Sequence, residues 1–278
     1  ALVIECLFYA LRQEKVCTEP DLNYVVHPGQ GPYLGLLHGF LSSGRQWLLN
    51  LEALSEVCTP VTIDMWGHGD SPAPSDLDLY GPQAYVDQLE HIREKLGANQ
   101  WFLCGYSLGA GITIRYTHQY PERVLAHGLT NSNSAFANDT LVQEWQASAE
   151  ASAKSIRAGG LSAIERIAVH PRHARRLPQT VYDALLQDSK KLSPDAVANT
   201  LLRTNVDVST RDIASTNPRP ALLAFGRHEK RFSAAKDWAL ANMANLKVIE
   251  MDAGHAVNME DAEAFNAAWI AFIREQAS

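Results

Sequence analysis

One pentapeptide constrains the fold of this chain more than any other feature. The sequence GYSLG at residues 105–109 follows an apolar run at residues 101–104 and precedes a helical stretch. A G-x-S-x-G pentapeptide between a strand and a helix forces the serine onto a tight turn with strained backbone angles, because only glycine neighbours let the strand and helix approach. The hydroxyl then projects at the helix N-terminus, where the helix dipole and a free amide favour an oxyanion. The pentapeptide therefore predicts a serine nucleophile at Ser107.

The rest of the chain alternates short apolar runs with amphipathic stretches. This pattern is typical of strands and crossover helices around a mostly parallel sheet, an α/β architecture. Apolar residues at helical spacing predict helices at residues 82–96 and 262–273. The predicted strands are residues 22–27, 33–37, 61–64, 101–104, 124–130, 221–225 and 247–251, with another possible near residues 3–9.

Residues 136–219 break this alternation. They read as consecutive helices separated by turn signals, with no convincing strand. We therefore expect a helical cap, or lid, inserted into a core formed by residues 1–135 and 220–278. A solvated surface is the favoured interpretation of the basic cluster in the cap, although it could also face an anionic substrate. The cluster consists of Arg172, His173, Arg175 and Arg176.

Composition narrows the function classes. The chain has 278 residues, 46% of them hydrophobic and 20% charged, which is enough to bury a large core. Its net charge of −7 argues against a nucleic-acid surface and favours a small-molecule partner. No uncharged apolar run reaches the about 20 residues that a membrane span needs, and a signal peptide is a poor match, although export stays open. The four cysteines lack metal-ligand spacing, which predicts reduced thiols in a cytoplasmic protein and no metal site.

A serine hydroxyl needs a general base to remove its proton, and the base needs a carboxylate to orient it. Two further residues fit these roles. His255 comes soon after the strand expected at residues 247–251, in a loop near the end of the chain, and is predicted to be the general base. Glu229 follows the strand at residues 221–225 and would fix the tautomer of His255. Asp252 is the rival acid, but it lies close to His255 in sequence. The order nucleophile, acid, histidine is the one that a G-x-S-x-G turn requires.

Acyl transfer also needs two amide donors for the developing oxyanion. The turn after the strand at residues 33–37 contains Gly39, so the amide of Phe40 could point at the site beside that of Leu108. His38, in the same turn, is interpreted as structural.

Together these motifs resemble the α/β-hydrolase superfamily over nearly the whole chain. Beyond the pentapeptide, the resemblance rests on three further features. They are the turn at His38-Gly39, the loop at residues 64–71, which resembles the pattern D-x-x-G-x-G-x-S, and Gly254-His255 near the end of the chain. It implies an eight-stranded sheet, a helical cap over a pocket, no cofactor, and hydrolysis of esters, thioesters, amides or activated carbon–carbon bonds. Most members carry Asp where this chain has Glu229, so the acid is a departure from the pattern.

Within the superfamily we expect a carboxylesterase. Apolar cap residues, namely Phe136, Trp145 and Leu161, favour a substrate with a hydrophobic acyl or alcohol group. Residues 38–47, 105–109 and 226–232 also resemble the menaquinone-pathway synthases that eliminate pyruvate. Those lyases, however, resemble one another in an arginine shortly after the serine turn, where this chain has Ala110-Gly111. A ligand receptor with an intact triad is the non-enzyme alternative. Epoxide hydrolases and haloalkane dehalogenases use a carboxylate nucleophile, so Ser107 argues against both.

Overall fold

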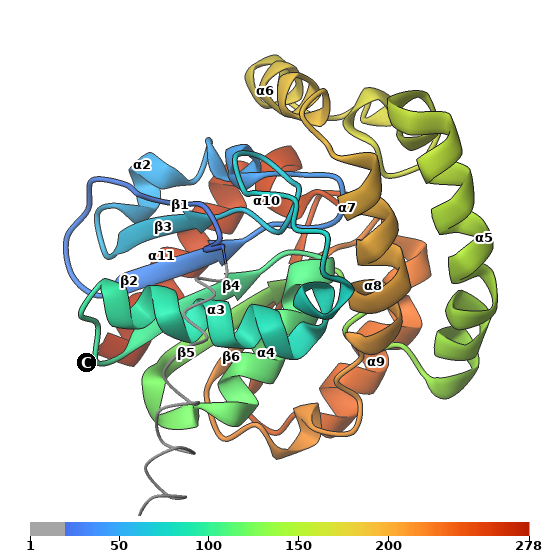
Figure 1. The fold of residues 1–278 in the computed structure, drawn as a ribbon. Coiled ribbons are helices and arrows are strands. Elements are labelled where there is room, and N and C mark those ends of the chain that lie inside the picture. The colour runs from blue at the N-terminus through green and yellow to red at the C-terminus, as the bar shows by residue number, and fades with distance from the viewer. Residues whose placement is uncertain (1–19, 278) are drawn as a thin grey trace, which may run out of the picture.

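The protein is described by a computed structural model, in which residues 20–277 are placed (Figure 1). Seven strands in this part form one sheet in the order β1-β3-β2-β4-β5-β6-β7. They are β1 (Tyr24–Val26), β2 (Tyr33–Leu37), β3 (Thr59–Ile63), β4 (Trp101–Gly105), β5 (Val124–Thr130), β6 (Ala221–Gly226) and β7 (Leu246–Met251). Strand β1 runs antiparallel to β3, and every other neighbouring pair is parallel.

The α/β architecture expected from the sequence is confirmed. Each of the seven predicted apolar runs became a strand, with ends that differ by at most two residues from those expected. The possible additional strand at residues 3–9 lies outside the described residues, so the eight strands implied by the resemblance are seven in residues 20–277.

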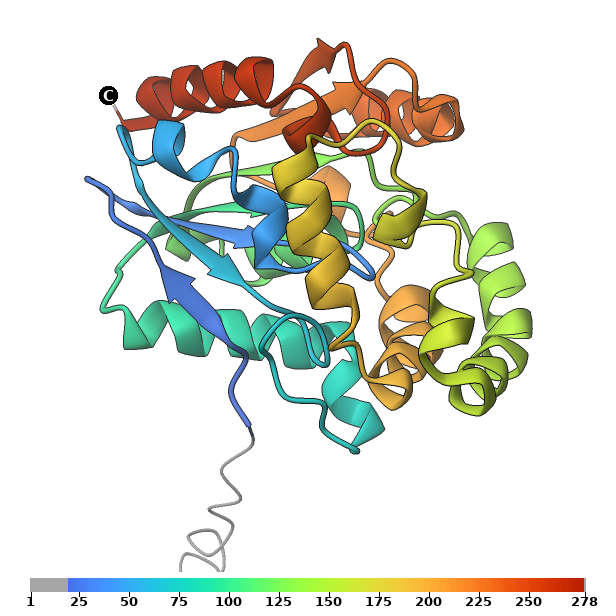
Figure 2. The same ribbon diagram turned by 90° about the horizontal axis from the view of Figure 1, so that it is seen from above.

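Burial explains why the central strands read as uninterrupted apolar runs. All five residues of β4 are buried, because helices cover both faces of the parallel sheet. Helices α3 (Pro82–Lys95), α4 (Leu108–Gln119) and α9 (Ser233–Asn242) pack on one face. Helices α2 (Leu51–Leu54) and α11 (Ala262–Ala277) pack on the other, and Figure 2 shows α3 and α11 on opposite sides of the sheet.

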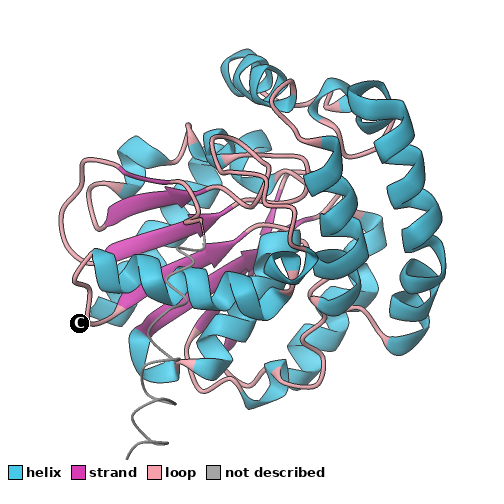
Figure 3. Cartoon of the chain, viewed as in Figure 1, coloured by secondary structure: helices cyan, strands magenta, loops and turns pink. Residues whose placement is uncertain are grey.

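Between β5 and β6 this described part of the chain forms helices joined by loops and contains no strand. Its α-helices are α5 (Asp139–Ile164), α6 (Gln179–Ser189), α7 (Pro194–Asn199) and α8 (Asn205–Asp207), with short 3-10 turns and a π-helical turn at Thr200–Thr204. These helices lie beyond the carboxyl ends of the strands (Figures 1 and 3). That a cap is inserted at residues 136–219 as a unit of its own stays a prediction.

The structure bears on two expectations from composition, the absence of a membrane span and the reduced state of the cysteines, within the described residues. No helix in residues 20–277 combines the length and the apolar character needed to cross a membrane. Cys58 and Cys104 are free, buried thiols. Cys6 and Cys17 lie outside the described residues.

Candidate active site

Ser107 occupies the turn between β4 and α4, as the pentapeptide predicts. Its backbone angles are φ 51° and ψ −111°, in the left-handed half of φ space that residues other than glycine rarely adopt. Both backbone groups of Ser107, its amide and its carbonyl, make hydrogen bonds to the end of β5 and the residues after it. The Ser107 amide donates to the hydroxyl of Thr130 at 3.2 Å, and the hydroxyl of Ser132 donates to the Ser107 carbonyl at 2.6 Å.

The two glycines of the pentapeptide are required by close approach rather than by their own backbone angles. A Cβ at Gly105 would lie 2.5 Å from the Cα of Ala110, and one at Gly109 would lie 2.5 Å from the carbonyl oxygen of His38. Such contacts are far shorter than a side chain tolerates. The glycines therefore allow strand β4, helix α4 and the turn after β2 to meet around Ser107.

His255 lies opposite the serine, in the loop that joins β7 to α10 (Val257–Glu260). Its Nε2 is 3.1 Å from the Oγ of Ser107, a hydrogen-bond distance. The Tyr106 ring packs edge-on against the imidazole, with centroids 5.4 Å apart. The structure thus brings together the nucleophile and the base that the sequence predicts, from positions 148 residues apart.

The carboxylate nearest to the other imidazole nitrogen belongs to Glu229. Its Oε2 lies 3.6 Å from the Nδ1 of His255, and its side chain is half-buried. The rival, Asp252, is exposed and is paired with His228 at 2.6 Å and with Arg227 at 2.8 Å. Those two partners lower the pKa of Asp252. Of the two acids considered, only Glu229 faces His255.

Opposing effects act on the protonation of His255. Burial lowers its pKa from the ordinary value, while the carboxylates of Glu229 and Glu260 oppose that shift, and the net result is a lowered pKa. A base whose free form is favoured at neutral pH can accept a proton from a hydroxyl, and a facing carboxylate stabilises the imidazolium that forms.

The two expected amide donors lie next to residues that contact the serine or belong to its turn. Leu108 is the first residue of α4, so its N–H is among the four that have no acceptor within the helix. A Cβ at Gly39 would lie 3.1 Å from the Cβ of Ser107, and Phe40 follows directly. Phe40 thus directly follows a residue that closely approaches Ser107, and Leu108 directly follows Ser107 at the start of α4.

Two buried histidines, His38 and His68, fix the loop that carries Phe40; the sequence predicts a structural role for His38 but no role for His68. The amide of Leu41, a residue with φ of 59°, donates to the Nε2 of His68 at 3.2 Å. The amide of Met65 donates to the Nε2 of His38 at 2.9 Å, and each Nδ1 bonds a backbone carbonyl. Because each Nε2 accepts a hydrogen bond, both rings are neutral with the proton on Nδ1. Burial lowers the pKa of His68 to about 3 and also lowers that of His38.

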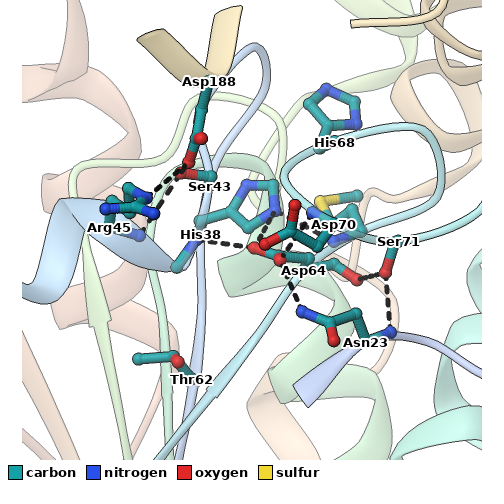
Figure 4. A network of polar contacts seen from close by, with 12 residues as sticks. Asn23, His38, Ser43, Arg45, Thr62, Asp64, His68, Asp70, Ser71 and Asp188 are labelled. Atoms are coloured by element: carbon teal, nitrogen blue, oxygen red, sulfur yellow. Dashed lines mark hydrogen bonds and ion pairs between the residues drawn. The ribbon is translucent and has the colours of Figure 1, made fainter. Parts of the chain in front are cut away.

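Asp64 stabilises the neighbouring turn of residues 64–71 (Figure 4). One of its oxygens accepts from the Gly44 amide at 2.7 Å, and the other accepts from the Asp70 amide at 3.0 Å and the Asn23 side chain at 2.9 Å. A carboxylate with three N–H donors holds its surrounding backbone rigidly. The turn that carries His68 is thus tied to the segment preceding β1 and to the turn after β2.

Figure 4 also shows a contact from the helical segment to this network. The buried carboxylate of Asp188 in α6 accepts from the Ser43 hydroxyl at 2.7 Å and pairs with Arg45 at 3.2 Å. Lys191 adds a third contact to Asp188 at 3.0 Å. Helix α6 is therefore anchored to the loop region that carries the candidate amide donor Phe40.

The other residues that the sequence analysis singled out in the segment 136–219 differ in their burial and in their contacts. Phe136 is buried against Trp238, with ring centroids 5.4 Å apart, while Leu161 is 40% exposed. In the basic cluster, Arg172 pairs with Glu165 at 2.6 Å. Arg176 pairs at 3.2 Å with Glu260, whose carboxylate also accepts from the Gly254 amide at 2.8 Å. The cluster is thus partly neutralised, and only Arg176 among these contacts reaches the loop of His255.

Comparison with known proteins places this geometry in context. A family model described as alpha/beta hydrolase fold matches residues 32–262. Bifunctional epoxide hydrolase 2 of Sus scrofa is 30% identical over 125 residues, which cover 44% of this chain and 22% of that protein. A putative 2-succinyl-6-hydroxy-2,4-cyclohexadiene-1-carboxylate synthase of Bacillus subtilis (strain 168) is 34% identical over 90 residues, 32% of each chain. The chain thus matches less than a third of the length of either relative.

Among solved structures, MenH from S. aureus superposes over most of both chains. The TM-score is 0.82 with 20% sequence identity, and the match covers 92% of this chain and 99% of MenH. At that identity the likeness concerns the fold. The described sheet and its flanking helices therefore have a full-length structural counterpart.

Proposed function

Because this chain belongs to the alpha/beta hydrolase fold family, we propose that it is a serine hydrolase that cleaves a carboxylic ester through an acyl-enzyme. The observation that carries the proposal is the 3.1 Å approach of His255 Nε2 to Ser107 Oγ on a strained strand-to-helix turn. The resemblance implies that epoxide hydrolases of this fold use a carboxylate as nucleophile. The residue on the turn here is a serine, which argues against epoxide hydrolysis. Glu229 completes the triad.

In the first half of the reaction, His255 takes the proton of Ser107 as the oxygen attacks the ester carbonyl. The Nδ1–H of His255 turns toward Glu229, whose negative charge stabilises the imidazolium. The carbonyl oxygen becomes an oxyanion, which the amides of Phe40 and Leu108 stabilise by hydrogen bonds. His255 then gives the proton to the departing alkoxide, and the acyl group stays on Ser107.

In the second half, the same groups act on water. His255 removes a proton from a water molecule, whose oxygen attacks the acyl carbon, and the second oxyanion meets the same two amides. Return of the proton to Ser107 releases the carboxylic acid. No cofactor takes part in this scheme. The substrate is proposed to be a small molecule with a hydrophobic acyl or alcohol group that enters between the core and residues 136–219.

A second candidate is a pyruvate-eliminating lyase. The similarity to the Bacillus subtilis synthase in sequence and to MenH in fold favours it. Against it stands Ala110-Gly111 directly after the turn, where no cation is available to grip a substrate carboxylate. We therefore rank ester hydrolysis first.

The test is hydrolysis of p-nitrophenyl esters of increasing acyl length by the wild-type protein and by Ser107→Ala, together with a fluorophosphonate that labels activated serines. We expect turnover with an optimum chain length, labelling at Ser107 identified by mass spectrometry, and loss of at least about 10⁴-fold of the rate in the variant. Equal rates in both proteins would refute the proposal. Labelling without ester turnover would favour the lyase or the receptor role.

A further inference from the structure

A buried asparagine at the end of β5 joins the two loops that carry His255 and Glu229. Asn131 has no exposed surface. Its side-chain oxygen accepts from the amide of Gly226 at 3.1 Å, and its side-chain nitrogen donates to the carbonyl of Gly254 at 3.1 Å. Gly226 ends β6 and begins the turn that leads to Glu229, while Gly254 directly precedes His255.

The chemistry of the two partners selects a carboxamide. One partner offers an N–H and the other a carbonyl oxygen, so the side chain between them must accept on one atom and donate on another. An ionised aspartate would place an acceptor against the Gly254 carbonyl, and an apolar side chain would leave two buried backbone groups without partners. Asparagine meets both requirements at once.

The residues on either side of Asn131 contact the third part of the site. The Ser107 amide donates to Thr130, and the Ser107 carbonyl accepts from Ser132. Three consecutive residues, the last of β5 and the two that follow it, thus bind the backbone of all three segments that carry the proposed triad. Within this segment, Asn131 alone bonds both the histidine loop and the acid loop.

We propose that Asn131 is a positioning residue, which sets the separation of His255 and Glu229 and thereby aims the imidazole at Ser107. The inference rests on the proposed function. The separations it controls are the 3.6 Å between His255 and Glu229 and the 3.1 Å between His255 and Ser107. Since Asn131 is fully buried and reaches only backbone groups, it acts on the triad without touching the substrate.

Removal of the carboxamide should therefore slow the chemical step. A displacement of about 1 Å in a catalytic group can cost about 100-fold in rate, so Asn131→Ala should lower kcat by about 10- to 100-fold. KM should change by less than about three-fold, because binding of the ester is not affected. Asn131→Ser, which is less disruptive and can keep one of the two hydrogen bonds, should lose less.

Asn217 provides a matched control. It is also buried, its nitrogen contacts His127 at 2.6 Å and its oxygen accepts from the Arg219 amide at 3.0 Å. It precedes β6, at the amino end of that strand, whereas Asn131 follows β5 at the carboxyl end. Asn217→Ala should lower the melting temperature about as much as Asn131→Ala and leave kcat unchanged. Equal kcat in the two variants at equal stability would overturn the inference.

A second measurement does not depend on turnover. The downfield proton resonance of the His255 Nδ1–H, assigned by its loss in His255→Gln, reports the pairing of the imidazole with Glu229. We expect the resonance in wild type and Asn217→Ala, and its loss or broadening in Asn131→Ala and Asn131→Ser. An unchanged resonance in both Asn131 variants, or its absence from wild type, would overturn the inference. If the resonance behaves as expected but no ester is cleaved, the proposed function fails and the positioning role stands.

Discussion

Two histidines around the candidate site, His68 and His255, have opposite surroundings. The His68 ring is completely buried and both of its nitrogens bond backbone groups. His255 is half-buried, and its nitrogens face a hydroxyl and a carboxylate, those of Ser107 and Glu229. His68 is thus held by backbone groups, whereas His255 contacts two polar side chains.

The difference shows how one residue type can either brace a loop or move a proton. A second proton on His68 would set an N–H against the N–H of Leu41 in a fully buried position, so burial keeps the ring neutral. A second proton on His255 is met by the carboxylate of Glu229. The partner of each nitrogen, rather than the imidazole itself, decides which role is open.

The largest effect on kcat is expected from removing the Glu229 carboxylate, the partner that His255 has and His68 lacks. Glu229→Gln keeps the shape of the side chain but removes the charge and can impose the wrong tautomer on His255, so kcat should fall by about 10⁴-fold. Asp252→Asn is the matched control, because that carboxylate is bound to Arg227 and His228 on the surface. Steady-state kinetics on the best ester would check both. A crippled Asp252→Asn with an active Glu229→Gln would reassign the acid.

A smaller effect is expected from the scaffold histidine. His68→Leu removes the acceptor of the Leu41 amide, which loosens the loop that presents the Phe40 amide to the oxyanion. Loss of one such donor costs about 100-fold or more in kcat, so we expect a fall approaching that size with KM little changed. His68→Gln, which can still accept a hydrogen bond, should recover part of the rate. The comparison would be wrong if both variants lost stability but kept wild-type kcat.

The smallest effect is expected at a third buried histidine, His127, and concerns how the free energy of unfolding depends on pH. Burial lowers the pKa of His127 from 6.5 to about 4. Between those values the unfolded chain binds a proton that the folded protein excludes, so the free energy of unfolding decreases as the pH falls through this window. His127→Gln should make the decrease shallower by up to about 1.4 kcal/mol per pH unit, while activity at neutral pH is unchanged. Denaturant unfolding at several pH values measures the slope, and identical slopes would contradict a neutral buried His127.

Much of the sheet was predictable because its inner strands are buried on both faces. Strands β2 and β5 have the expected bounds, since an uninterrupted apolar run such as residues 33–37 can be satisfied in few other ways. Ser107, His255 and Glu229 could be named because each follows a strand in the required order, and the structure brings the three together. Their catalytic roles remain a proposal.

The supports of the site could not be predicted in the same way. Asn131 bonds backbone groups 95 and 123 residues away, and a backbone N–H or carbonyl leaves no trace in the sequence. An asparagine after a strand has the appearance of any loop residue. His38 was expected to be structural, but its hydrogen bond to Met65, 27 residues along, follows only from the path of the chain. Residue identity thus predicted the reacting groups better than the groups that hold them.

The backbone of Ser107 has a consequence for how the sequence can evolve. A residue other than glycine with positive φ costs on the order of 1–3 kcal/mol, so selection for folding alone would favour glycine at this position. Ser107→Gly would relieve the strain and, at the same time, delete the hydroxyl. The strain at Ser107 must be offset by contacts elsewhere in the fold, and the proposed role of its oxygen gives a reason to keep a residue that costs stability.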